Sequence, residues 1–191
     1  HQDWLDSNKM QYADLVCVTG YSTEGRRFGE VFAEKERKLH DAYPFWIPAK
    51  CPEKYADMIV QKPDAKYIKN IGITHVISAA AEGKHDIESE LAEMGIRVFS
   101  NASTHRWDAD VPLLIPEINP ESLTEDSMIT CCTNCTLHGY IYLIYAFADS
   151  DKKPRLKNVW VGTKQSLSGK GDAITDKEYI DTYITGKCTS M

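Results

Sequence analysis

The sequence predicts an α/β fold built on a mainly parallel sheet, because short apolar runs alternate with segments of helical periodicity. The first run, at 15–18, ends close to Gly20, and apolar side chains at helical spacing follow it from 28 to 39. The same alternation returns further along the chain. We therefore expect strand–helix units that place helices on both faces of a sheet.

The remaining elements follow in the same order. The proline-rich stretch 41–64 predicts a loop with a weak strand at 58–60. Segment 87–94 has helical periodicity, and Gly95 is a suitable residue to end that helix. Further strands are expected at 74–78, 96–99, 128–130 and 159–161, and further helices at 137–147 and 179–184.

Composition excludes several classes of protein. The 191 residues include 22 basic and 28 acidic ones, giving a net charge of −6, with 42% hydrophobic residues, as is typical of a soluble globular protein. No apolar run approaches the ~18 residues of a membrane span. The acidic balance and the lack of a basic cluster argue against nucleic-acid binding.

The N-terminal and cysteine patterns bear on the compartment. The first residues show no signal-peptide pattern. Three of the six cysteines are crowded into 131–135, unlike the spaced cysteines of a secreted disulfide framework. We therefore expect an intracellular protein, in the cytoplasm or an organelle interior.

A glycine-containing turn lies between the first expected strand and helix. It comprises Gly20, Tyr21, Ser22, Thr23, Glu24 and Gly25. The phosphates of a dinucleotide bind at this place in such folds, against backbone N–H groups and a helix N-terminus. The full glycine fingerprint of a dinucleotide-binding turn has three glycines, and this turn has two. A cofactor loop and an ordinary strand–helix turn both explain it.

The cysteine cluster precedes an apolar helix. Cys135 is best placed at the expected helix N-terminus, where the helix dipole favours the nucleophilic thiolate. Other interpretations are a Cys132–Cys135 redox pair, half of a zinc site, or an inert buried thiol. The sequence offers no second ligand pair for zinc, so we expect no metal.

Four motifs occur in a recognisable order. They are the 20–25 turn; the string SNASTHR with DVPLLIPEINP inside 98–123; Asn134-Cys135-Thr136; and Gln165 with Ser168-Gly169-Lys170-Gly171. Together they resemble aspartate-semialdehyde dehydrogenase, in the branch found in fungi and archaea. The resemblance extends from about residue 15 to residue 171.

The resemblance implies a Rossmann-like dinucleotide-binding domain at 12–135 and the start of a catalytic and dimerisation α+β domain at 136–191. It implies NADP-dependent interconversion of aspartyl phosphate and aspartate semialdehyde, a step of amino-acid biosynthesis. Homo- or hetero-oligomers are expected, with no membrane span.

The resemblance also implies roles for individual residues. Cys135 would form a thioester, Gln165 would orient the acyl group, and Asn134 would contact the substrate. Arg106 would bind the substrate phosphate. The implied cofactor contacts are Gly20, Ser22, Thr23, Gly25, Ser78, Ser168 and Gly169.

The chain departs from the family pattern in two ways. Its glycine turn is one residue shorter than the family's, and Glu24 adds negative charge beside the phosphate path. No motif here matches the family's general-base histidine and second substrate arginine, which lie in the later half of a longer chain. Two alternatives to a working dehydrogenase stay open: an inactive structural subunit of a larger assembly, and a redox protein using Cys132 and Cys135.

Overall fold

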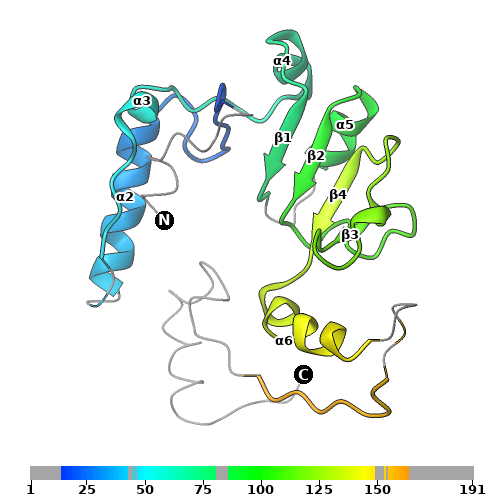
Figure 1. Ribbon diagram of the computed structural model, residues 1–191. Helices are drawn as coiled ribbons and strands as arrows, with labels where there is room; N and C mark the ends of the chain where they lie inside the picture. The colour runs from blue at the N-terminus through cyan, green and yellow to red at the C-terminus, as the bar shows by residue number, and fades with distance from the viewer. Residues whose placement is uncertain are drawn as a thin grey trace, which may run out of the picture. The chain divides into compact units, whose positions relative to one another are not determined.

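The computed structural model describes residues 14–42, 45, 47–80, 86–148, 153 and 155–163 (Figure 1). The chain divides into two compact units. The first comprises 1–112 with 123–131, and the second comprises 113–122 with 132–191.

The first unit contains a parallel sheet. Strands β1 (His75–Ser78), β2 (Arg97–Ser100) and β4 (Ile129–Cys132) lie in the order β1-β2-β4, and both pairings are parallel. Val98 of β2 is paired with Val76 on one side and Ile129 on the other, while β1 lies at the edge of the sheet formed by the described residues. The expected strands at 74–78, 96–99 and 128–130 are thus confirmed within one residue or two, as is the parallel sheet.

Helix α5 (Ile87–Glu93) connects β1 to β2 and packs against β2 (Figure 1). Asp86 caps its N-terminus by accepting the Ser89 N–H at 3.1 Å, and Gly95 follows its end with φ of 75°. The cap, the apolar spacing and the terminal glycine explain why this helix was predictable. The buried apolar side chains of the first unit include Val60, Ala65, Ile68, Ile87, Leu91, Ile96, Val98 and Ile129.

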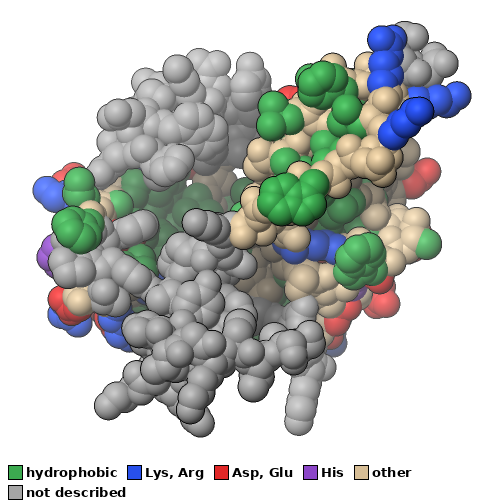
Figure 2. Space-filling view, turned by 90° about the horizontal axis from the view of Figure 1, so that it is seen from below, with side chains coloured by type: hydrophobic (Ala, Val, Ile, Leu, Met, Phe, Trp, Pro, Cys, Tyr) green, Lys and Arg blue, Asp and Glu red, His purple; other side chains and the backbone are tan. Residues whose placement is uncertain are grey.

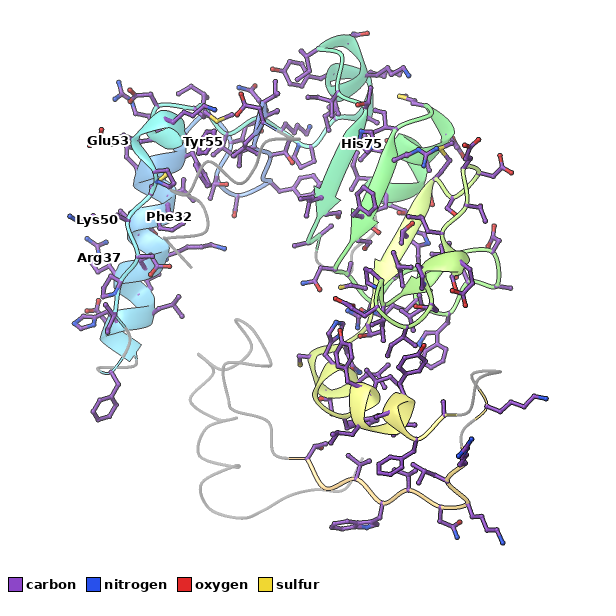
Figure 3. The ribbon with its side chains drawn as sticks, in the orientation of Figure 1. Phe32, Arg37, Lys50, Glu53, Tyr55 and His75 are labelled. Carbon is purple, nitrogen blue, oxygen red and sulfur yellow. The ribbon has the colours of Figure 1, made fainter. Side chains whose placement is uncertain are left out.

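Helix α2 (Phe28–Ala42) confirms the amphipathic helix expected after the glycine turn. It packs against α3 (Glu53–Ala56), a short helix within the proline-rich stretch for which we expected a loop; Figure 3 labels Tyr55 on α3. A Cβ at Gly29 would lie 3.0 Å from the Ala56 Cβ, so glycine permits this close approach.

Helix α4 (Ala65–Asn70) is a second element that the sequence did not predict. Asp64 caps it by accepting the Tyr67 N–H at 2.8 Å, and the side chains of Ala65 and Ile68 are buried. With only two buried positions, the helix is too short to show a clear apolar period.

The strand expected at 15–18 is not formed, and this prediction was wrong. Instead, Gln61 donates its N–H to Val18 O at 2.9 Å and accepts the Gly20 N–H at 2.9 Å, which forms one isolated parallel bridge between Thr19 and Gln61. Two residues earlier, Ile59 bridges Arg27 in the antiparallel sense. Segment 59–61 therefore pairs with one segment in each direction, and each pairing is an isolated bridge and not a ladder.

The second unit contains β3 (Leu113–Leu114), the 3₁₀ helix η1 (Pro120–Ser122) and α6 (Cys135–Ala146). The Asn119 side chain ties the first two together: its Oδ1 accepts the Ile115 N–H at 2.7 Å, and its Nδ2 donates to Leu113 O at 3.0 Å. Helix α6 confirms the apolar helix expected at 137–147 and begins two residues earlier.

Apolar side chains of the second unit are exposed. No residue of α6 is buried, and Figure 2 shows hydrophobic side chains on the face that it views. The strand expected at 159–161 was also wrong: these residues are irregular, and Trp160 is 92% exposed. A strand forms only where another strand pairs with it, and no strand among the described residues does so here. The expected helix at 179–184 lies outside the described residues.

No helix in the described part of the chain is both long enough and apolar enough to cross a membrane.

Candidate functional site

The glycine turn is fixed at both ends. The Gly20 N–H donates to Gln61 O at 2.9 Å, and the Gly25 N–H donates to Val60 O at 2.8 Å. Glycine suits both places: a Cβ at Gly20 would lie 2.5 Å from Thr23 Oγ1 and displace that hydroxyl, and Gly25 has φ of 79°. The two glycines therefore shape the turn, and their own amides are already bonded within the protein.

The residues between the two glycines are the ones that could meet a phosphate. They form a turn shortly before α2, with Ser22 exposed and Thr23 half-buried. Hydroxyls and turn amides in front of a helix suit the phosphates of a dinucleotide, so the turn fits such a cofactor through 21–24. The exposed Glu24 carboxylate in the same turn would repel phosphate.

The charges that follow the turn are paired along α2. Glu34 accepts hydrogen bonds from Lys38 at 2.8 Å and from Arg26 at 2.7 Å. These bonds, that of Lys38 foremost, lower the pKa of the Glu34 carboxyl to about 2. The Arg26 guanidinium is thus held by Glu34.

Ser78 lies at the carboxyl end of β1, the sheet edge at which ligands bind in open α/β folds. Its hydroxyl donates to Glu88 Oε1, and the same oxygen accepts the Ser100 hydroxyl at 2.9 Å. Glu88, on α5, is 2% exposed. One buried carboxylate therefore joins the ends of β1 and β2, a role that the sequence analysis missed.

His105 lies beside this carboxylate. Its Nδ1 is 2.7 Å from Asp108 Oδ2 and its Nε2 is 3.1 Å from Asp86 Oδ1, while Glu88 Oε2 is 4.0 Å from Nε2. Burial alone would lower the pKa of His105, but the hydrogen bonds to Asp108 and Asp86 outweigh burial and raise it. The nearest sequence signal was the position of this histidine inside the SNASTHR string.

Arg106 follows His105 and is half-buried. Its guanidinium donates to Asn101 O at 3.0 Å, and the Asn101 N–H donates to Ser78 O at 2.8 Å. Two of the expected site residues, Ser78 and Arg106, are thus joined through Asn101. No hydrogen bond of the described residues joins the 20–25 turn to Ser78.

Cys135 is the first residue of α6 and is exposed, as expected of a thiol at a helix N-terminus. Asn134 is the N-cap, and its Oδ1 accepts the Leu137 N–H at 2.8 Å. Cys131 is buried and Cys132 half-buried. Among these three thiols, that of Cys135 is the exposed one.

His138, one turn after Cys135, has a packing role. Its Nδ1 is hydrogen-bonded to the Thr133 hydroxyl, and its ring meets that of Tyr142 edge-on, with centroids 6.2 Å apart. The Tyr142 hydroxyl donates to Glu117 at 3.2 Å. These contacts brace the first two turns of α6.

The remaining predicted site residues, Gln165, Ser168 and Gly169, lie outside the described residues. The described residues that are candidates for binding the cofactor or the substrate phosphate, in the 20–25 turn, at Ser78 and at Arg106, belong to the first unit. Asn134 and Cys135 belong to the second.

Comparison with known proteins agrees with the motifs. Residues 8–126 match the family described as semialdehyde dehydrogenase, NAD binding domain. Malonyl CoA reductase (NADP) of Metallosphaera sedula is 30% identical over 91% of this chain and 47% of its own length. Aspartate-semialdehyde dehydrogenase of Candida albicans is 26% identical over 79% of this chain and 46% of its own.

A crystal structure of the Candida albicans aspartate-semialdehyde dehydrogenase with NADP has a similar fold. The TM-score is 0.54 at 22% identity, over 75% of this chain and 42% of that one. The chain spans about half the length of the curated relatives it matches. The match over 8–126 covers more than half of the chain, and it confirms both the resemblance and the Rossmann-like α/β fold. The chain therefore belongs to the semialdehyde dehydrogenase family and carries that family's NAD-binding domain.

Proposed function

We propose that this chain supplies the dinucleotide-binding domain and the nucleophile of an NADP-dependent dehydrogenase that interconverts aspartyl phosphate and aspartate semialdehyde. In this proposal, residues 12–135 form the cofactor domain and residues 136–191 begin the catalytic domain. The observation that supports it most is the exposed Cys135 thiol at the N-terminus of α6, directly after a strand of the sheet.

Cys135 is the attacking group. Its thiolate adds to the carbonyl carbon of the acyl phosphate, the C–O bond to phosphate breaks, and a thioester and inorganic phosphate result. The negative charge on the carbonyl oxygen is stabilised by backbone N–H groups at the very start of α6, at Cys135 and Thr136, ahead of the Leu137 N–H that Asn134 accepts. The Asn134 cap fixes that turn in place.

The nicotinamide cofactor, when bound, supplies the hydride that reduces the thioester carbon. The C–S bond then breaks, the aldehyde leaves, and the Cys135 thiolate is restored without another proton donor. On the protein side, the hydroxyls of Ser22 and Thr23 bind the cofactor phosphates in the turn shaped by Gly20 and Gly25. The resemblance adds Ser78, Ser168 and Gly169 to the cofactor contacts and Gln165 to the groups that orient the acyl chain.

Arg106 binds the phosphate of the substrate. A guanidinium suits this role because its planar N–H groups can bond two phosphate oxygens at once. Arg106 belongs to the loop that follows β2, and its link through Asn101 to Ser78, at the carboxyl end of β1, supports this role.

A second candidate is reduction of an acyl-CoA thioester. The Metallosphaera sedula relative, whose name states malonyl-CoA reduction with NADP, matches 91% of this chain. Both reactions use a thiol nucleophile and a hydride, and they differ in the group that leaves when Cys135 attacks.

The test is made on the intact protein that contains this chain. Aspartate semialdehyde is supplied with NADP and either inorganic phosphate or free coenzyme A, and formation of reduced nicotinamide is followed by absorbance. Phosphate-dependent turnover supports the first candidate, and coenzyme A-dependent turnover supports the second. Absence of both, together with absent NADP binding by calorimetry, would favour the inactive structural subunit.

A further inference from the structure

The mechanism above leaves an ionic cluster unused, in which His105 and Glu88 are buried while Asp86 and Asp108 are partly exposed. It consists of His105 and three carboxylates, those of Asp86, Glu88 and Asp108. His105 is 7% exposed, and both of its ring nitrogens face carboxylate oxygens. A neutral imidazole has one N–H, so it can donate to only one of them. Only the imidazolium can donate to Asp86 and Asp108 together.

The charge balance of the cluster points the same way. Glu88 Oε2 is buried without a hydrogen-bond partner, and His105 Nε2 lies 4.0 Å from it. An ionised carboxylate removed from water needs a nearby positive charge. The imidazolium places a positive charge 4.0 Å from this buried oxygen, while Glu88 Oε1 accepts the Ser78 and Ser100 hydroxyls.

The cluster joins two separate segments. Asp86 and Glu88 belong to the cap and first turn of α5, while His105 lies in the loop that follows β2. The start of this loop is held by Ser100, whose hydroxyl accepts the Ala102 N–H at 3.1 Å. Arg106 is the next residue after His105. The His105 ring therefore fixes the backbone beside Arg106, the residue proposed to bind the substrate phosphate.

We propose that His105 is a positioning residue: as an imidazolium it holds the 101–108 loop to the N-terminus of α5, so that the Arg106 guanidinium is preset for a phosphate group. This inference rests on the proposed function, in which Arg106 binds the substrate phosphate. His105 itself touches no substrate and transfers no proton in the reaction.

The proposal gives phosphate binding a defined pH dependence. The groups facing the ring are Asp86 and Glu88 from α5 and Asp108 from its own loop. Because the hydrogen bonds to Asp108 and Asp86 raise the pKa of His105, the ring keeps its charge to a higher pH than a free imidazole while these carboxylates are ionised. The ion pairs are then lost as pH rises through the raised pKa. Affinity for phosphate falls over the same interval.

Three variants of the intact protein test this. Asp108→Asn removes one charge from the cluster at a partly exposed position, and His105→Gln removes the imidazolium. Asp110→Asn makes the same charge change at an exposed site nearby and serves as the control. The probe is inorganic phosphate in the oxidative direction, with KM for phosphate and kcat measured across pH.

We expect His105→Gln to raise the KM for phosphate by roughly tenfold or more, with a smaller change in kcat. Asp108→Asn should move the midpoint of the KM profile to lower pH, and Asp110→Asn should leave it unchanged. If His105 had a purely structural role, Asp108→Asn would leave the midpoint of the KM profile unchanged. Identical profiles for Asp108→Asn and the wild type would overturn the proposal.

A second measurement separates this inference from the proposed function. Proton NMR follows the His105 ring in wild type and Asp108→Asn, and calorimetry follows binding of inorganic phosphate. Suppose that turnover is absent, that the His105 ring titrates at a higher pH than free histidine, and that phosphate affinity falls as the ring loses its proton. The proposed function then fails and the positioning role stands. If the ring titrates as free histidine does, or phosphate affinity ignores its titration, the positioning role fails even where turnover is found.

Discussion

Apolar side chains are buried in the α5 region of the first unit, whereas in the α6 region of the second unit none is buried. Leu91 of α5 is 2% exposed, and Ile96, just before β2, is fully buried. In α6, Leu143 is 67% exposed and no residue is buried. Both helices were predicted from sequence, yet only one contributes to a core.

The difference shows that a sequence pattern can specify a helix without specifying which surface that helix packs against. Segment 87–93 buries Ile87 and Leu91, together with the carboxylate of Glu88, and the helix packs against β2. Segment 135–146 is apolar on most sides, as is typical of a helix covered by several neighbours. The described residues give α6 no such cover.

Replacing the thiol at that end is expected to have the largest effect. Cys135→Ala should reduce turnover by at least about a thousandfold, because the covalent step is lost, with little change in stability because the side chain is exposed. The measurements are steady-state kinetics and thermal unfolding. Cys132→Ser is the matched control and should retain activity. Equal losses in both variants would instead favour the redox pair.

The contrast in burial predicts a second pair of effects. Leu91→Ala should lower the free energy of unfolding by about 2–5 kcal/mol, because it opens a cavity in the core. Leu143→Ala should change it by less than about 0.5 kcal/mol. Urea denaturation measures both. A large loss for Leu143→Ala would mean that α6 is covered in solution, and the contrast between the regions would then disappear.

The sequence predicted the sheet and α5 because their signals are local. Strands 74–78 and 96–99 are apolar runs bounded by turn residues, and Asp86 and Gly95 mark the ends of the helix between them. Segments 15–18 and 159–161 are equally apolar runs, but they have no continuous partner strand among the described residues. An apolar run by itself does not show whether another strand will pair with it. Helices α3 and α4 are too short to show a period.

The same distinction holds for the site. Cys135 was predictable because a strand, an Asn cap and an apolar helix follow one another in sequence. The Glu88–His105 cluster was not, because its members lie on α5 and on the loop after β2, and only folding brings these together. Roles implied by the resemblance for Gln165, Ser168 and Gly169 stay predictions.

A smaller effect is expected at the cap of α6. Asn134→Ala removes the acceptor for the Leu137 N–H and should cost about 1 kcal/mol of stability, measured by thermal or urea unfolding. Asn158→Ala, at an exposed position outside any helix, is the control and should be neutral. Because Asn134 also fixes the turn that carries Cys135, kcat should fall as well; a stable, fully active variant would contradict both roles.

The smallest effect is an acid dependence in α2. The folded-state pKa of Glu34 is about 2, below its ordinary value of 4.5, so its ion pairs stabilise the fold above pH 4.5 and are lost as pH falls toward 2. Glu34→Gln should therefore differ from wild type near neutral pH and match it near pH 2. Thermal unfolding at several pH values measures this, with Glu30→Gln as control. Added salt should shrink the difference, since the pairs are exposed.

The edge position of β1 has a consequence for handling the protein. An edge strand presents unpaired N–H and C=O groups on its outer side, and Ile77 in the middle of β1 is 88% exposed. Such a strand is a template on which another chain can add by backbone hydrogen bonding, which is how aggregation begins. Ile77→Lys, which places a charge at that point, should slow aggregation at high protein concentration without touching the buried face of the sheet.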